Sequence, residues 1–169
     1  MKWLRMLVGM ACCLGACDYP PEKTPPDFLL EYAAGPVHAD RSGHTFIRIR
    51  PSAADSPAVE VVCGVRSRVL IPQEGRLLDR EDTTATGTLL PDDARPLYDA
   101  IVLNRFWRLK DRYVDRDILD GSYERLKIRA GGREKTVVLV NKANRRFRGI
   151  VDALEALTDP QRNPKMRLR

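Results

Sequence analysis

The sequence predicts an α+β domain in which a single antiparallel sheet of about five to six strands carries two helices on one face. Residues 123–130 alternate apolar and basic side chains up to Gly131-Gly132, a two-residue turn that hairpins favour. Residues 97–109 and 147–157 instead carry apolar side chains at helical spacing. No helical periodicity interrupts residues 28–90, so their short connections favour an antiparallel meander.

Four strands are expected in the first half of the chain. Residues 28–32 form the first, and residues 44–50 alternate clearly enough to form the second. Residues 58–70 contain a third strand, with Val59, Val61, Cys63 and Val65 in phase. Residues 76–90 contain the β-branched run Thr83-Thr84-Ala85-Thr86, which favours a fourth.

The second half is expected to contain a helix, a hairpin and a final helix. Pro91-Asp92-Asp93 is typical of a helix start, with aspartate as the cap, and Asn104 is a candidate for the end. The hairpin returns through residues 136–140. Asn144 is expected to cap the last helix, which Asp159-Pro160 ends.

The N-terminus has the pattern of an export signal. Lys2 and Arg5 precede an apolar run of about nine residues, too short to span a bilayer as a helix. Leu14-Gly15-Ala16-Cys17 then resembles the lipobox of bacterial lipoproteins, in which the peptide is cut before the cysteine. That resemblance implies a diacylglyceryl group and an N-acyl chain on Cys17, which together give stable membrane attachment.

Some features leave alternatives to this interpretation. Gly15 stands where the family more often has Ala, Ser or Thr, and Cys12 and Cys13 are competing cysteines in poorer contexts. A plain secretory signal with an incidental cysteine is the other interpretation.

The expected domain organisation follows from this signal. Residues 1–16 are the signal peptide, residues 17–27 the lipidated cysteine and a proline-rich tether, residues 28–159 one α+β domain, and residues 160–169 a basic tail. The domain would face the periplasm. Asp18 resembles a signal that retains lipoproteins in the inner membrane. Attachment to the outer membrane is the alternative.

Charge and cysteine counts change once the signal is removed. The whole chain carries 29 Lys and Arg against 23 Asp and Glu, or +6, and loss of Lys2 and Arg5 leaves 27 against 23, or +4. Cys63 would be the one thiol left free, so no intrachain disulfide is expected. Its apolar neighbours predict a buried small side chain.

A basic face is the one feature with a testable binding interpretation. It could meet an anionic lipid surface or an acidic envelope protein, whereas the compartment argues against nucleic acid. The simpler interpretation is a solvated strand face. The residues are Arg125, Lys127 and Arg129 on one strand, Arg133 and Lys135 near the turn, and Arg145, Arg146 and Arg148 at the last helix.

The sequence contains no complete pattern for a zinc, calcium or phosphate site. His38, Asp40 and His44 lack a further ligand at zinc spacing, and the Asp115–Asp120 loop fails the EF-hand register. Gly131-Gly132 is too short for a phosphate loop. We therefore expect no metal or other cofactor.

The order of elements resembles a family of small bacterial lipoproteins of unknown function. Its motifs here are Leu-Leu-Pro-Asp at the helix entry, Asn-x-Phe at the exit and Asp120-Gly121 before the hairpin, within residues 28–157. The resemblance implies a fold and no activity. The leading hypothesis is a non-enzymatic binding lipoprotein; the alternative is an envelope hydrolase or other enzyme with a site near His38, His44 and the Asp115–Asp120 loop.

Overall fold

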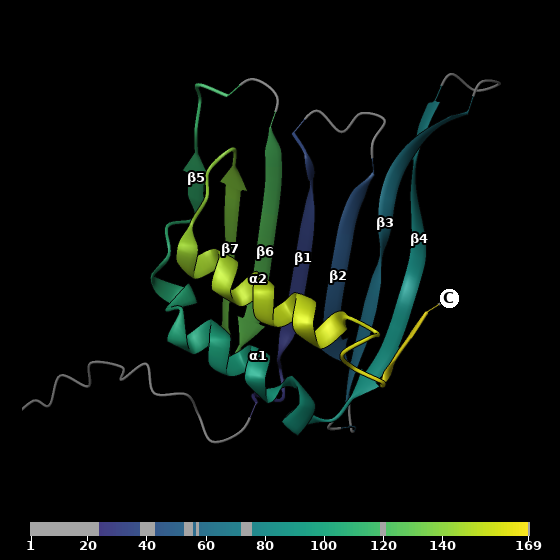
Figure 1. Cartoon of the computed structure of the whole chain (residues 1–169), viewed down its shortest axis with the longest axis vertical. Coiled ribbons are helices and arrows are strands. Elements are labelled where there is room, and N and C mark those ends of the chain that lie inside the picture. The colour runs from purple at the N-terminus through teal and green to yellow at the C-terminus, as the bar shows by residue number, and fades with distance from the viewer. Residues whose placement is uncertain are drawn as a thin grey trace, which may run out of the picture.

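The computed structural model of the chain describes residues 24–37, 43–52, 56, 58–71, 76–118 and 121–168. Two helices lie across one face of a large twisted sheet (Figure 1). The elements in chain order are β1 (Leu29–Pro36), β2 (His44–Pro51), β3 (Val59–Ile71), β4 (Arg76–Leu89), α1 (Pro91–Leu103), the 3₁₀ turn η1 (Phe106–Arg108), β5 (Arg112–Val114), β6 (Ser122–Ala130), β7 (Arg133–Val140), α2 (Arg145–Thr158) and β8 (Met166–Leu168).

The predicted sheet was wrong in strand number and in direction. The sheet has eight strands in the order β5-β7-β6-β1-β2-β3-β4-β8, and β5 pairs with β7 in parallel, so the sheet is mixed. All six expected strands are present, and the two that were missed are three-residue strands at the sheet edges. Strands of that length show no readable alternation. The parallel pair arises because β7 inserts between β5 and β6, which the local sequence does not reveal.

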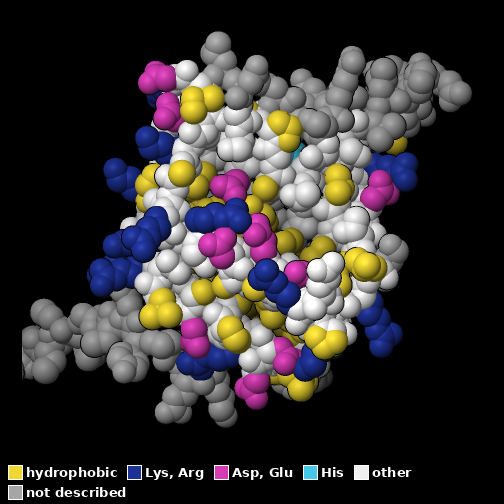
Figure 2. Space-filling view, in the orientation of Figure 1, with side chains coloured by type: hydrophobic (Ala, Val, Ile, Leu, Met, Phe, Trp, Pro, Cys, Tyr) yellow, Lys and Arg dark blue, Asp and Glu magenta, His cyan; other side chains and the backbone are white. Residues whose placement is uncertain are grey.

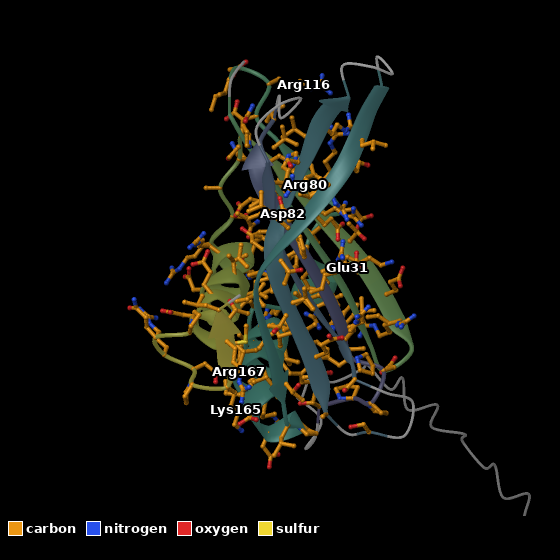
Figure 3. The ribbon with its side chains drawn as sticks, turned by 90° about the vertical axis from the view of Figure 1, so that its right-hand side faces the viewer. Glu31, Arg80, Asp82, Arg116, Lys165 and Arg167 are labelled. Atoms are coloured by element: carbon orange, nitrogen blue, oxygen red, sulfur yellow. The ribbon has the colours of Figure 1, made fainter. Side chains whose placement is uncertain are left out.

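One face of the sheet is packed against the helices and the other is not. Cross-strand neighbours Leu30 and Ile49 are both fully buried, whereas Glu31 points away from the helices (Figure 3). Burying each large apolar side chain contributes about 1.5–3 kcal/mol, so this layer supplies most of the stability. Its largest fully buried members include Leu30, Ile49, Leu126 and Ile128 from the strands and Leu97, Ile101, Phe147, Ile150 and Leu154 from the helices.

Local capping explains where the helices begin and end. The N-cap of α1 is Leu90, and Asp93, at the third helical position, accepts a hydrogen bond from the Leu90 amide at 2.8 Å. Aspartate therefore stabilises the start from inside the first turn, not as the expected cap. Asn104 ends α1, as predicted. The predicted cap of α2 is also confirmed, because the Asn144 side chain accepts from the Arg146 and Phe147 amides at 3.0 and 3.1 Å.

The β6–β7 turn is held by a residue from the start of the chain. Gly131 and Gly132 both have positive φ, 58° and 71°, which glycine adopts without steric cost. The Asp27 carboxylate accepts hydrogen bonds from their two amides at 2.7 and 2.8 Å. Thr24 also bonds the Pro91 carbonyl at 3.3 Å. Residues 24–27, expected in the tether, are therefore part of the folded body.

The expected basic tail is likewise integrated into the fold. β8 pairs with β4 through the Met166–Gly87 register, and Met166 is only 4% exposed. A Cβ on Gly87 would lie 2.6 Å from the Met166 sulfur, so this close approach requires glycine. The described part of residues 160–169 thus covers one edge of the sheet.

We expect Asp27→Ala to lower the free energy of unfolding by about 1–2 kcal/mol, because two turn amides lose a charged acceptor. Burial opposes ionisation of Asp27, but the bonds from Gly132 and Gly131 hold its pKa below the usual range. The stabilisation is therefore present above that usual range and lost as the pH falls through the lowered pKa. Urea unfolding at neutral and acid pH measures both effects.

The matched control is Asp152→Ala, which removes an exposed carboxylate paired with Arg148 on α2. It should change stability by less than about 0.5 kcal/mol. Equal losses in the two variants would contradict the role given to Asp27.

Candidate functional site

The face of the sheet opposite the helices contains a cavity of about 420 Å³, within the size range of small-ligand sites. Its lining comes from β1, β2, β3, β4 and β6 at the end of the sheet where β2 and β6 begin. The residues are Glu31, Tyr32, Ala33, Val37, His44, Phe46, Arg48, Arg66, Ser67, Arg68, Asp79, Tyr123 and Arg125.

Two glycines shape the floor of this cavity. His44 and Tyr123 come from strands on either side of β1, and their rings meet edge to face at 5.8 Å. A Cβ on Gly35 of β1 would lie 2.4 Å from the His44 ring. The missing side chain at Gly35 therefore makes room for the His44 ring beside Tyr123.

Gly64, on β3, makes room for a second ring in the same way. A Cβ there would lie 2.7 Å from the Phe46 ring, so the ring packs closely against Gly64, and Phe46 is only 5% exposed. The Arg48 guanidinium lies over the Phe46 ring at 4.7 Å, a cation–π contact. An arginine is thus fixed above an apolar floor.

A shared carboxylate joins two arginines at the cavity. Arg48 binds Glu81 in bidentate fashion, with Nη1 and Nη2 at 2.9 and 2.8 Å from the two carboxylate oxygens. Arg66 donates to the same Oε1 through Nε at 2.8 Å and through Nη2. The bonds from Arg48 and Arg66 lower the pKa of Glu81 to about 2, against a smaller opposing effect of burial.

The rim carries weaker pairs and a small positive excess. Arg68 lies 3.2 Å from Asp79, and Arg125 lies 3.8 Å from Glu31. Four arginines and two carboxylates line the cavity, and Glu81 adds a third carboxylate. One positive charge is therefore left over, which favours an anionic ligand.

The eight predicted basic residues do not form one surface. Arg125, Lys127 and Arg129 alternate with buried Leu126 and Ile128, so they lie on the open face as expected. Arg133 and Lys135 lie opposite Ala130 and Ile128 in the register, which places them on the helix side. The sheet therefore separates the two groups.

Three of the other five members of the predicted set have side-chain partners on the helix side. Arg133 lies over the Trp107 ring at 4.5 Å, and Lys135 pairs with Asp111 at 2.9 Å. Arg148 binds both Asp152 and Glu155. Arg145 and Arg146 begin α2 on this face, where basic side chains gather along the edge and mix with acidic ones at the centre (Figure 2).

The residues of the predicted enzyme site are not brought together where the structure describes them. His44 begins β2, whereas Asp115 follows β5 and is fixed beside β7 by a 2.9 Å bond from its amide to the Val140 carbonyl. Four strand spacings separate β2 from β5, or about 19 Å. His38, Asp40 and Asp120 lie outside the described residues.

Two further expectations concern cysteine and metal. Cys63 is half-buried against the core, and burial raises the pKa of its thiol to about 11, so the thiol stays protonated near neutral pH. Within the described ranges, no three His, Cys, Asp or Glu side chains are grouped as a metal site would require.

The sequence interpretation missed the residues that matter most at the cavity. Arg48, Arg66 and Glu81 come from three different strands and meet only through the pairing of β3 with β2 and β4. The available signal was the alternation in residues 44–50, which places Phe46 and Arg48 on the same strand face. That alternation identified a strand but not which face stays open.

Comparison of the chain with known protein families and with curated proteins finds no match. Leu14 to Cys17, which the sequence predicts to form a lipobox, lie outside the described part of the chain. Among the helices that are described, none is long and apolar enough to cross a membrane.

We expect Glu81→Gln to lower the free energy of unfolding by less than about 1 kcal/mol near neutral pH, since the group is partly exposed and screened. Because the folded pKa of about 2 lies below the ordinary 4.5, Glu81 stabilises the fold above that ordinary value. Its contribution disappears as the pH falls towards 2. The difference between wild type and variant in urea unfolding should shrink over that window.

Glu60→Gln is the matched control, because Glu60 lies on the same face and, among the described residues, forms an ion pair with Arg50 and with no second arginine. A Glu81→Gln effect that is no larger than the Glu60→Gln effect, or that does not vary with pH, would contradict the shared-carboxylate account.

Proposed function

We propose that this chain is a non-enzymatic binding protein of the bacterial envelope, held at a membrane by lipid on Cys17 and binding its ligand on the open face of the sheet. The Leu14-Gly15-Ala16-Cys17 pattern after a short apolar run supports the anchor. The cavity over Phe46 carries the binding half of the proposal, because it combines an apolar floor with fixed cationic donors.

The chemistry of the cavity favours binding over proton transfer. Guanidinium groups stay protonated throughout the physiological pH range, so they hold anions and do not act as general acids or bases. The bonds from Arg48 to Glu81 raise the pKa of Arg48 further, against a smaller opposing effect of burial. Arg48 therefore acts as a permanent cation.

The chain enters the folded body at the end of the sheet away from the cavity. Asp27 binds the Gly131-Gly132 turn, whereas Tyr123, at the cavity, begins the same β6 strand. Six residues, two of them proline, lie between Cys17 and Thr24 in the sequence. A protein anchored in this way would present the cavity to the periplasm, and Asp18 favours the inner membrane.

The anchor is tested by Cys17→Ser in the full-length protein expressed in a bacterium. Wild-type protein should enter the membrane fraction and carry lipid by mass spectrometry and palmitate labelling, since thioether lipidation needs the cysteine sulfur. Cys17→Ser should carry none. Cys13→Ser is the control and should behave as wild type; lipid retained by Cys17→Ser, or lost from Cys13→Ser, would sink the proposed anchor.

The binding face is tested by a photoreactive amino acid placed at Arg68, on the cavity rim, or at Arg162, an exposed position beyond α2. After illumination of intact cells, intact-mass analysis should show an adduct from position 68 and none from position 162. Equal adducts at both positions, or an adduct at position 162 alone, would contradict the assignment of the open face.

A further inference from the structure

We infer that the cavity on the open face binds a small soluble organic anion, whose phosphate or carboxylate group is held by Arg48 and Arg66 while its apolar part packs beside Tyr123, Ala33 and Val37. This inference depends on the proposed function in one respect, because both place the binding site on the open face of the sheet.

The two arginines keep donors for a ligand. A guanidinium has five N–H groups, and Glu81 takes two from Arg48 and two from Arg66. Three N–H groups on each guanidinium therefore have no hydrogen-bond partner among the residues that the structure describes. Both side chains line the cavity and are partly exposed, so a bound oxyanion can reach these donors without displacing Glu81.

Glu81 makes the pair a fixed site. Its Oε1 accepts from both arginines, so the two guanidiniums are held around one point although they belong to different strands. The bidentate contact and the stacking of Arg48 on Phe46 fix that side chain from two directions. Two cations on one carboxylate leave a net positive charge for the ligand.

The size and the floor of the cavity indicate an organic ligand. A water molecule takes up roughly 30 Å³ in the liquid, so a volume of about 420 Å³ exceeds what a bare oxyanion needs. Ala33, Val37, Phe46 and Tyr123 supply apolar and aromatic contact beside the arginines. A compact apolar group bearing one oxyanion matches both features.

The position of the cavity favours a soluble ligand over a lipid head group. β1 runs for eight residues, or about 26 Å, from the Asp27 end of the sheet to the end where Val37, His44 and Tyr123 line the cavity, and the lining extends back along β1 as far as Glu31. Head groups of the membrane that holds Cys17 would meet the opposite end of the sheet first. A ligand dissolved in the periplasm has no such restriction.

The test is calorimetric titration of phenyl phosphate into the full-length lipidated protein in phosphatidylcholine nanodiscs. Phenyl phosphate should bind more tightly than inorganic phosphate, which lacks the apolar part, and phenol should not bind. Arg66→Gln should weaken the binding of phenyl phosphate about tenfold, as expected for loss of a charged contact. Equal affinities for phenyl phosphate and inorganic phosphate, or no binding of phenyl phosphate, would overturn the inference.

Arg50→Gln is the matched control. Arg50 lies on the same strand and face as Arg48 and pairs with Glu60, but it does not line the cavity. The Arg50→Gln protein should bind phenyl phosphate with wild-type affinity. Urea unfolding of both variants separates a lost contact from a lost fold, and equal weakening by Arg66→Gln and Arg50→Gln at equal stability would refute the site.

Phosphatidylglycerol nanodiscs distinguish the two sources of anion. A soluble ligand predicts the same phenyl phosphate affinity in both kinds of disc, whereas competition from anionic discs would show that head groups occupy the cavity and would overturn the inference. An adduct at position 68 in cells without phenyl phosphate binding would end this inference and leave the proposed binding face standing.

Discussion

One-sided burial of the sheet is the constraint on which the rest of this structure depends. Alternate residues of the long strands pack under α1 and α2, and the intervening residues face away from both helices. An antiparallel sheet tolerates this arrangement because its backbone bonds are satisfied within the plane. The exposed face must then be stabilised by its own side chains, and here ion pairs between strands contribute to this.

The cavity is a consequence of how that exposed face is built. Glycines at 35 and 64 allow the His44 and Phe46 rings to lie across neighbouring strands, which lowers the surface locally and places aromatic carbon at its floor. Arginines then rise around this floor because their strand positions alternate with the core. Among the described residues, the lining of this cavity thus comes almost entirely from regular strands.

Long-range contacts also hold the described segments nearest the two termini against the rest of the domain. Asp27 binds a turn more than a hundred residues away, and Met166 packs on Gly87. The described parts of the expected tether and tail, residues 24–27 and 160–168, are therefore regions of the domain. The physical reason is that unpaired strand edges and free turn amides are unfavourable when left uncovered, so the chain that lies beside them becomes ordered against them.

The sequence by itself determined the elements that local chemistry specifies. The six long strands follow from alternation, β-branched composition and turn signals, the hairpin from Gly131-Gly132, and the start of α2 from Asn144, because each depends on residues a few positions apart. The tertiary structure alone decided the insertion of β7 between β5 and β6, the two short edge strands and the meeting of Arg48 and Arg66 at Glu81. These depend on strand register between distant segments, which no local pattern encodes.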